Sequence, residues 1–510
     1  MYYDVNVNNS MKRLSLKLLR QILGAAVFVA ITLLLLDVSG YLHQHLSWLP
    51  KIQLIPALLA ANFVIVGILA ALTLLFGRIY CSVVCPLGIM QDLIARVGRR
   101  RKRNPYSYSR PLTWLRIAAL VVFVVLTLLG FTAIAGLIAP YSTYGRIITH
   151  LFQPVWIGAN NLLASGAEQV DSYAVSSTDW VFYGWVPIAV TAATLLIIGY
   201  LAYRYGRTWC NTICPVGTTL GFLSRFSLLK VRIDDAKCIT CGSCARNCKA
   251  SCIDSKAHRI DYSRCVVCGN CIGHCSTKAL YYGVKRKSPA SQPEEKAADD
   301  KVDDAKRNFL VGTAMLAGVA MAQQAKKVDG GLAVIEKKVE PKRSTPLTPP
   351  GAISARNLQQ HCTACQLCIS ECPNDVLRPS TDLSTLMQPV MSYEHGYCRP
   401  ECNRCSQVCP TGAIRPIEVE RKASLQIGHA VWVKKNCVAI TDGVSCDNCA
   451  RHCPTGAITL VKMDPDDESS PMVPAINTEV CIGCGACENL CPARPFSAIY
   501  VEGHEMHREI

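Results

Sequence analysis

The chain has 510 residues, of which 50% are hydrophobic and only 18% are charged, so we expect several domains and a protein that lies partly in a membrane. It contains 29 cysteines, mostly in closely spaced groups, which indicates metal ligands and argues against a disulfide framework. Lys and Arg outnumber Asp and Glu by 16, but much of this excess lies in one short loop, 96–110, between hydrophobic stretches, so we expect no nucleic-acid partner.

Four apolar stretches before residue 230 are each long enough to cross a bilayer as a helix, which takes about 20 residues. They are Leu18–Leu36, Leu54–Phe76, Leu112–Ile138 and Tyr183–Tyr203. Basic residues precede the first stretch, follow the second and follow the fourth, which places them all on one side. We therefore expect a four-helix membrane domain over 1–230, in a multi-pass protein of the cell inner membrane whose N terminus is cytoplasmic.

An internal repeat follows the second and the fourth of these stretches. Both Gly77–Gly88 and Gly206–Gly217 contain Gly-Arg, an aromatic residue, the motif C-x3-C-P and a final glycine. Repeated units pack against each other, so we expect the two motifs to lie close together. Three roles remain open: a shared four-thiolate site for a cluster or another metal, a dithiol–disulfide pair that passes electrons, or a tight turn with buried thiols. The cysteines concerned are Cys81, Cys85, Cys210 and Cys214.

Two runs of C-x2-C-x2-C-x3-C follow, and they predict a two-cluster ferredoxin domain over 231–283. In this pattern the fourth cysteine of each run binds the other [4Fe–4S] cluster, whereas structural zinc sites use cysteine pairs. The expected ligand sets are Cys238, Cys241, Cys244 and Cys275, and Cys265, Cys268, Cys271 and Cys248. Lys249 and Ser276 replace the usual proline after each run, which removes no ligand. Cys252 is left over, and we expect it to be a packed apolar cysteine.

Four more cysteine runs lie in the expected polyferredoxin domain, 357–510. Their sixteen cysteines complete four further quartets, which makes six [4Fe–4S] clusters in the chain. Tandem and nested pairing of the runs remain open. The cysteines are Cys362, Cys365, Cys368, Cys372, Cys398, Cys402, Cys405, Cys409, Cys437, Cys446, Cys449, Cys453, Cys481, Cys484, Cys487 and Cys491. Because every quartet is complete, His361, His395, His429 and His452 are not needed as ligands.

Residues 284–356 are expected to be a disordered linker, because Val284–Asp304 has almost no large apolar residue. Within it, 305–322 has a basic pair, Phe-Leu, a short apolar run and Ala-Met-Ala, which resembles a twin-arginine export signal with Lys306 in place of the first arginine. The alternative is an amphipathic segment on the cytoplasmic side. Export would carry the polyferredoxin domain to the periplasm. Pro341–Pro350 is expected to be a second, stiffer linker.

The paired C-x3-C-P motifs followed by a two-cluster ferredoxin resemble the NapH family of membrane quinol dehydrogenase components, over about 10–280. Maturation factors for nitrous oxide reductase and cytochrome oxidase share that core. The polyferredoxin domain, with Thr348–Ala352 and the export-like segment before it, resembles the NapG family, the four-cluster electron-transfer subunit that partners NapH, over about 305–505. The whole chain thus resembles a NapH–NapG fusion.

The expected fold class is an α-helical membrane domain with four transmembrane helices, joined to small α+β ferredoxin-like iron–sulfur domains. Such a chain transfers electrons. The resemblance implies an oxidoreductase that takes electrons from the membrane quinone pool, as a quinol dehydrogenase, and passes them through six clusters to a reductase or cytochrome, with nitrate reductase as the acceptor by analogy. The alternatives are a redox maturation or maintenance factor for a metalloenzyme and a cytoplasmic polyferredoxin relay anchored to the membrane.

No catalytic residue stands out in the sequence. His43, His45, His150 and Asp92 are weak candidates for quinol binding. If the first two clusters are cytoplasmic and the last four periplasmic, a bilayer core of roughly 30 Å separates them. That is too far for a single tunnelling step, so the C-x3-C-P site and a quinone would have to bridge the gap.

Overall fold

The computed structural model describes residues 6–37, 41–102, 106–169, 177–178, 183–284, 338–468 and 470–510. The export-like segment 305–322 and most of the expected tether lie outside these residues. Residues 338–356 were expected to be linker, but they pack on the polyferredoxin domain. Leu347 is 1% exposed and Lys338 Nζ donates to the carbonyl of Glu488 at 2.6 Å. The polyferredoxin domain therefore begins near residue 338, because this segment buries apolar side chains against it.

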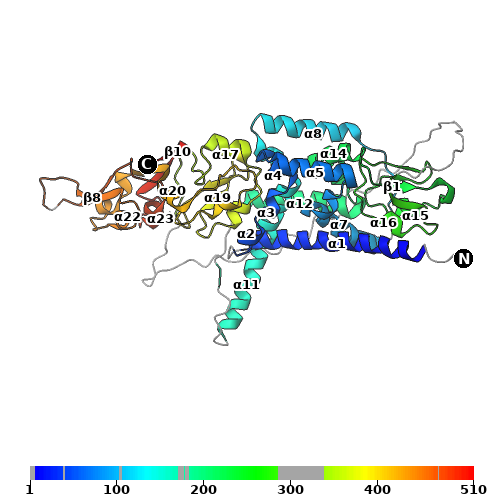
Figure 1. Ribbon diagram of the computed structural model, residues 1–510. Coiled ribbons are helices and arrows are strands. Elements are labelled where there is room, and N and C mark those ends of the chain that lie inside the picture. The colour runs from blue at the N-terminus through cyan, green and yellow to red at the C-terminus, as the bar shows by residue number, and fades with distance from the viewer. Residues whose placement is uncertain are drawn as a thin grey trace, which may run out of the picture.

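A helical unit occupies residues 6–224. Its elements are α1 (Asn6–Leu36), α2 (Tyr41–Leu46), α3 (Trp48–Lys51), α4 (Leu54–Leu59), α5 (Phe63–Phe76), α6 (Tyr80–Val83), α7 (Pro86–Lys102), α8 (Thr113–Leu128), α9 (Thr132–Ile138), α10 (Pro140–Ile147), a π-helix η1 (Ile148–Phe152), α11 (Gln153–Glu168), α12 (Trp185–Tyr205), α13 (Thr208–Thr212) and α14 (Pro215–Ser224). Helices α1, α5, α7 and α12 lie roughly along one direction (Figure 1).

Among the described residues, two helices are long and apolar enough to cross a membrane by length and composition. They are Lys17–Leu36 of α1, with a mean hydropathy of 2.2, and α12, with a mean hydropathy of 1.9. The other two expected spans are not single helices. Asn62 interrupts the second by capping α5, since its Oδ1 accepts from Ile65 N at 3.3 Å. Gly130, at φ +85°, interrupts the third between α8 and α9. The sequence analysis missed these breaks because a single asparagine or glycine hardly changes the mean hydropathy of so long a segment.

The first iron–sulfur domain follows α14. It consists of β1 (Lys230–Ile233), η2 (Asp235–Lys237), α15 (Ser243–Arg246), β2 (Ile253–Asp254), β3 (Arg259–Ile260), α16 (Asn270–Gly273) and β4 (Leu280–Gly283). Strand β1 pairs antiparallel with β4, and β2 pairs antiparallel with β3. Each short helix carries cysteines of one run, which gives the two-fold layout of a small α+β ferredoxin.

The polyferredoxin domain is likewise built from short helices and two-stranded antiparallel sheets, of which it has three among the described residues. Its elements are α17 (Ala355–His361), α18 (Leu367–Ser370), β5 (Leu377–Pro379), η3 (Leu383–Thr385), β6 (Pro389–Met391), α19 (Arg404–Val408), α20 (Val419–Ala423), β7 (Leu425–Trp432), η4 (Lys434–Asn436), α21 (Val438–Thr441), α22 (Asn448–Arg451), β8 (Ile458–Lys462), β9 (Met472–Ile476), α23 (Ala486–Leu490) and β10 (Ile499–Glu509). The pairs β5–β6, β7–β10 and β8–β9 are all antiparallel.

The two iron–sulfur domains lie at opposite ends of the helical unit (Figure 1). At one end, the first domain contacts α5, where Tyr282 Oη donates to the carbonyl of Phe76 at 2.9 Å. At the other end, the polyferredoxin domain contacts α9, where Thr132 Oγ1 donates to the carbonyl of Cys362 at 2.9 Å. The length of the helical bundle therefore separates the two groups of cysteine runs.

Candidate iron–sulfur and thiol sites

The first iron–sulfur domain encloses a small cavity lined by cysteines from both runs. Thr240, at φ +52°, and Gly242, at φ +70°, turn the loop around this cavity. The lining cysteines are Cys238, Cys241, Cys244 and Cys275. The structure thus brings together the first quartet that the spacing predicts, including the fourth cysteine from the other run.

The second quartet of this domain lies beside the leftover cysteine. Cys271 interacts electrostatically with Cys268, Cys265 and Cys248, the three cysteines expected to share its cluster. Cys252 is 1% exposed, and its Sγ lies 3.5 Å from Cys248 Sγ. A hydrogen bond from the Cys252 thiol lowers the pKa of Cys248 to about 6. Cys252 is therefore packed, as expected, but it also acts as a donor toward a cluster ligand.

In the polyferredoxin domain the cysteine runs pair in tandem. One cavity is lined by Cys409 of the second run and by three cysteines of the first run: Cys362, Cys365 and Cys368. Another is lined by Cys453 of the third run and by three cysteines of the fourth run: Cys481, Cys484 and Cys487. The other quartet of each pair of runs is also close together. Cys372 of the first run interacts with Cys402 and Cys405 of the second, and Cys491 of the fourth run interacts with Cys449 of the third, which interacts with Cys446. The first run therefore pairs with the second and the third with the fourth, and the runs are not nested.

The surroundings of these thiols suit thiolate ligands of a metal cluster. Backbone N–H groups point at sulfur, as for Ala498 N, which lies 3.3 Å from Cys491 Sγ, and Ile414 N, which lies 3.4 Å from Cys409 Sγ. Burial raises the pKa of the Cys449 thiol to about 11 and that of Cys484 to about 12. Such thiols ionise at neutral pH only when a metal stabilises the thiolate. The donor set therefore fits iron–sulfur clusters.

The cysteine quartets can also be compared with sites for a single metal ion such as zinc. Among the described residues, no three His, Cys, Asp or Glu side chains lie close enough to hold one metal ion. A zinc ion draws its four ligands to about 2.3 Å from one centre, whereas the thiolates of a cube bind four separate irons and stay farther apart. The runs of three cysteines at C-x2-C-x2-C spacing fit clusters better than zinc, which takes cysteine pairs.

The two C-x3-C-P motifs meet inside the helical unit, near the first iron–sulfur domain. All four thiols are 3–4% exposed and interact electrostatically with one another: Cys81, Cys85, Cys210 and Cys214. Each motif needs its final glycine, because a Cβ on Gly88 would lie 2.5 Å from the Cys81 carbonyl and one on Gly217 would lie 2.0 Å from the Cys210 carbonyl. The repeat logic correctly predicts this meeting.

Arginines cross between the two motifs. Arg78, from the first repeat, donates to Asn211 Oδ1 at 3.0 Å and to the Cys210 carbonyl at 3.4 Å. Arg207, from the second repeat, donates to the Cys81 carbonyl and holds Asp92 through two N–H groups at 2.6 and 2.7 Å. Both guanidiniums are fully buried. The crossing fixes the two motifs against each other.

The same arginines connect the thiols to the first iron–sulfur domain. Arg78 Nη1 donates to the carbonyl of Ser263 at 2.8 Å, and Lys249, which follows Cys248, pairs with Asp92. The thiol site therefore lies at the first-domain end of the helical unit. The site could serve as a step from the first group of cysteine runs toward the second, but a gap to the second group remains.

At the opposite end, a cysteine loop of the polyferredoxin domain lies directly on α9 and α10. A Cβ on Gly136 would lie 2.4 Å from the Thr363 carbonyl, and one on Gly145 would lie 2.2 Å from the Cys365 carbonyl. Arg146, 1% exposed, stands beside this loop and interacts with Cys365. Sequence reasoning missed Arg146, although it is the only Lys, Arg, Asp or Glu between Arg116 and Glu168 and could have been found on that ground.

The weak quinol candidates are scattered. His43 Nδ1 lies 2.6 Å from Glu371 Oε2 of the polyferredoxin domain, His45 packs its ring against Tyr41, and His150 is buried against Tyr183. Asp92 lies at the other end of the unit. The histidines among the cysteine runs bond elsewhere, as His361 does to the Asn357 carbonyl at 3.0 Å. The structure does not bring the four candidates into one site.

Family models match two parts of the chain. A 4Fe-4S binding domain model matches residues 58–105 and 185–234, which include both C-x3-C-P motifs. A 4Fe-4S dicluster domain model matches residues 443–494, within the third and fourth runs. The expected iron–sulfur character of the chain is confirmed.

Curated proteins are similar to parts of the chain. The methylamine utilization ferredoxin-type protein MauM of Methylobacillus flagellatus is 32% identical over 167 residues, which cover 32% of this chain and 70% of MauM. MauN of the same organism is 25% identical over 229 residues, covering 42% of this chain and 68% of MauN. The ferredoxin-type protein NapG of Escherichia coli is 32% identical over 152 residues, covering 28% of this chain and 65% of NapG. The NapG resemblance is confirmed at this level.

Proposed function

Because this chain belongs to the family of ferredoxin-type iron–sulfur proteins that includes MauM, we propose that it is a membrane-bound quinol dehydrogenase component. In this proposal it takes electrons from the quinone pool and passes them to a reductase system, with a NapH-like part fused to a NapG-like part. The observation that carries the proposal is the separation of the cysteine runs onto opposite ends of an apolar helical unit (Figure 1).

The surface of the helical unit supports a position in the bilayer. Large apolar side chains are exposed on α8 and α12, among them Val121 at 53%, Leu128 at 81% and Leu196 at 63%. Soluble proteins rarely expose so much apolar surface in one place. The interrupted helices α4–α5 and α8–α9 would complete four membrane crossings together with α1 and α12. Irregular backbone at membrane depth is tolerated where protein buries it, and Gly130 is buried.

Helix α11 supports the same placement. It projects from the polyferredoxin end of the unit, across the direction of α1 (Figure 1). Its exposed residues include Val155, Trp156, Leu162 and Leu163, and its only charged residue is Glu168. An apolar helix with a tryptophan that runs across the spanning helices suits a position at the membrane surface. The first domain would then face the cytoplasm and the polyferredoxin domain the periplasm.

The 24 cysteines in six quartets would hold six [4Fe–4S] clusters. When bound, each cluster accepts and passes one electron at a time. The protein's own contribution is to hold each thiol set, to keep water away and to direct N–H groups at sulfur. The loop Cys362–Cys368 lies on α9 and α10, so we assign the cluster of that quartet as the first acceptor in the polyferredoxin domain.

Iron analysis tests the cluster number. Six clusters require about 24 iron atoms per chain, and a further cluster on the C-x3-C-P thiols would raise this to about 28. The double variant Cys85→Ala, Cys214→Ala would lose about four irons only in the second case. Cys252→Ala is the control and should lose none. An iron content near 16 or below in anaerobically purified wild type would contradict six clusters.

The side of the membrane is tested with a tag at Ile510. Protease added to spheroplasts should remove the tag while a cytoplasmic marker survives. Protection of the tag would overturn the periplasmic placement and favour a cytoplasmic relay. Quinol-driven reduction of the clusters, sustained over many turnovers with an electron acceptor, separates a dehydrogenase from a maturation factor, since a maturation factor would show no steady flux.

A further inference from the structure

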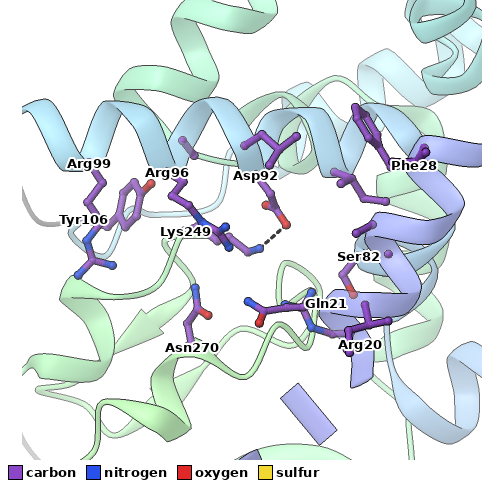
Figure 2. A pocket seen from close by; sticks show the side chains of 17 residues that line it. Arg20, Gln21, Phe28, Ser82, Asp92, Arg96, Arg99, Tyr106, Lys249 and Asn270 are labelled. Atoms are coloured by element: carbon purple, nitrogen blue, oxygen red, sulfur yellow. Dashed lines mark hydrogen bonds and ion pairs between the residues drawn. The ribbon is translucent and has the colours of Figure 1, made fainter. Parts of the chain in front are cut away.

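A cavity of about 650 Å³ opens between α1, α7 and the first iron–sulfur domain. This volume lies within the range of about 300–1,000 Å³ that is usual for small-molecule sites. Figure 2 shows its lining: Arg20 and Phe28 come from α1, Asp92, Arg96 and Arg99 from α7, and Lys249 and Asn270 from the iron–sulfur domain.

The cavity has an apolar side that reaches the surface of the helical unit. Ile22 and Val29 of α1 are 57% and 51% exposed, and Leu93 of α7 is 45% exposed. These side chains line the cavity and also face outward, where the bilayer would lie. A lipid-soluble molecule could therefore enter sideways without crossing water.

The inner wall is polar and carries many donors. Arg96 and Arg99 of α7 and Lys249 offer N–H groups, and the Asp92 carboxylate pairs with Lys249 at the wall (Figure 2). Arg207 holds that carboxylate from behind, with Nη2 at 2.6 Å from Oδ2. Carbonyl and hydroxyl oxygens of a ring would find hydrogen-bond partners here, while its apolar chain would leave between Ile22 and Val29.

Three lining residues are chain neighbours of cysteines in the candidate redox sites. Ser82 follows Cys81 of the first C-x3-C-P motif, Lys249 follows Cys248, and Asn270 precedes Cys271. The cavity is thus bordered both by the thiol site and by the second quartet of the first domain. A site that only binds lipid has no need of this position.

Resting on the function proposed above, we infer that this cavity is the quinol site, with the ring against Asp92, Arg96 and Lys249 and the isoprenoid tail along α1. Oxidation of one quinol there would release two electrons to the neighbouring iron–sulfur centres and two protons to water. Arg96 and Arg99 of the polar wall are exposed, so the cavity reaches water beside them and the protons can leave there.

Two adjacent alanines of α1 provide a matched test. Ala25 lines the cavity, whereas Ala26 is exposed but does not line it. Azido derivatives of ubiquinone and menaquinone are cross-linked to the full chain in phosphatidylcholine nanodiscs, and labelled peptides are mapped. We expect labelling of α1 and α7, loss of at least about tenfold in Ala25→Trp because the indole fills the path of the tail along α1, and no change in Ala26→Trp. Cluster absorbance verifies that both variants fold.

A second pair of variants avoids any packing change. Arg96→Gln should weaken labelling several-fold, and Arg204→Gln, which removes an exposed charge outside the cavity, should not. Displacement of the label by phosphatidylglycerol but not by unlabelled quinone would overturn the inference, since the cavity would then be a site for anionic lipid.

The same samples show whether the proposed quinol site or the proposed quinol dehydrogenase function is wrong. If quinol reduces the clusters equally fast in Ala25→Trp and Ala26→Trp, the quinol site lies elsewhere and the dehydrogenase function stands. If the label maps to this cavity but quinol reduces no cluster, the site stands and the dehydrogenase function falls. Absence of both labelling and reduction in the wild type overturns both.

Discussion

The two iron–sulfur domains are joined to the helical unit in different ways. Buried side chains of the polyferredoxin domain, such as Ile369 and Leu367, belong to the same hydrophobic core as Ile31 and Leu34 of α1. The first domain instead has a small core of its own around Val231 and Ile253. The polyferredoxin junction has the larger shared apolar core beside its buried His43–Glu371 pair, whereas the first domain adds Val266 to that core and has the buried ions of Asp92 and Lys249.

The difference indicates that the two junctions respond to different perturbations. An apolar junction tolerates changes in charge but not in volume, because packed interiors have little free space. A junction made by buried ions fails when one partner is removed, because the remaining charges lose their compensation. Asp92 of the helical unit forms an ion pair with Lys249 of the first domain. At the other junction, the missing side chain of Gly145 leaves room for the Cys365 loop of the polyferredoxin domain. Substitutions at these two positions test the contrast.

The largest effect is expected for Asp92→Asn. Its side chain is 18% exposed and pairs with Arg207 and Lys249, so the amide would leave two buried cations unpaired. We expect a loss of about 3–5 kcal/mol in the free energy of unfolding. Urea titration in detergent, followed by absorbance of the bound clusters, measures it.

The matched control is Asp447→Asn, which removes an exposed ion pair with Arg451. Exposed pairs contribute little, so its unfolding midpoint should stay at the wild-type value. An equally stable Asp92→Asn protein would contradict a junction held by ions.

A smaller effect is expected for Gly145→Ala. The new Cβ would lie 2.2 Å from the Cys365 carbonyl, and overpacking of this kind costs about 1–3 kcal/mol. Electron transfer to the polyferredoxin clusters should slow, because the displaced loop carries ligands of the nearest quartet, while reduction of the first-domain clusters is unchanged. Rapid-mixing absorbance and EPR distinguish the two groups. Gly166→Ala, where nothing lies within 4 Å of the added Cβ, should leave both rates intact.

The smallest effect is expected for Cys252→Ala. Its thiol donates toward Cys248, and losing one hydrogen bond of about 1 kcal/mol would lower the potential of the adjacent cluster by about 40 mV. EPR-monitored redox titration measures this potential. Cys252→Ser keeps a donor and should shift it less. Equal shifts in both variants would show that packing, and not the hydrogen bond, sets the potential.

Much of the cysteine arrangement was predictable. Spacing alone predicted the exchange of fourth cysteines in the first domain, and repeat logic predicted that Cys81 and Cys210 meet. Local spacing could not decide tandem against nested pairing, because that depends on how separate runs pack. The Cys398 N–H donating to the Cys484 carbonyl at 2.9 Å is such a contact between the two pairs.

The helical unit was harder to predict. Hydropathy correctly indicated α1 and α12 but joined α4 to α5 and α8 to α9, because one residue such as Asn62 or Gly130 hardly changes a window average. The cavity beside α1 could not be foreseen, since Arg96 and Lys249 lie far apart in sequence and meet only through tertiary packing.

The crossed arginines also constrain the order of biosynthesis. The carbonyl of Cys81 receives its hydrogen bond from Arg207, 126 residues later in the chain. When only the first repeat has been synthesised, Cys81 and Cys85 do not yet have their partners from the second repeat. Those thiols therefore lack the contacts of the assembled site until the second repeat has been inserted beside them. Any cofactor at this position would be loaded late, after the helices have assembled.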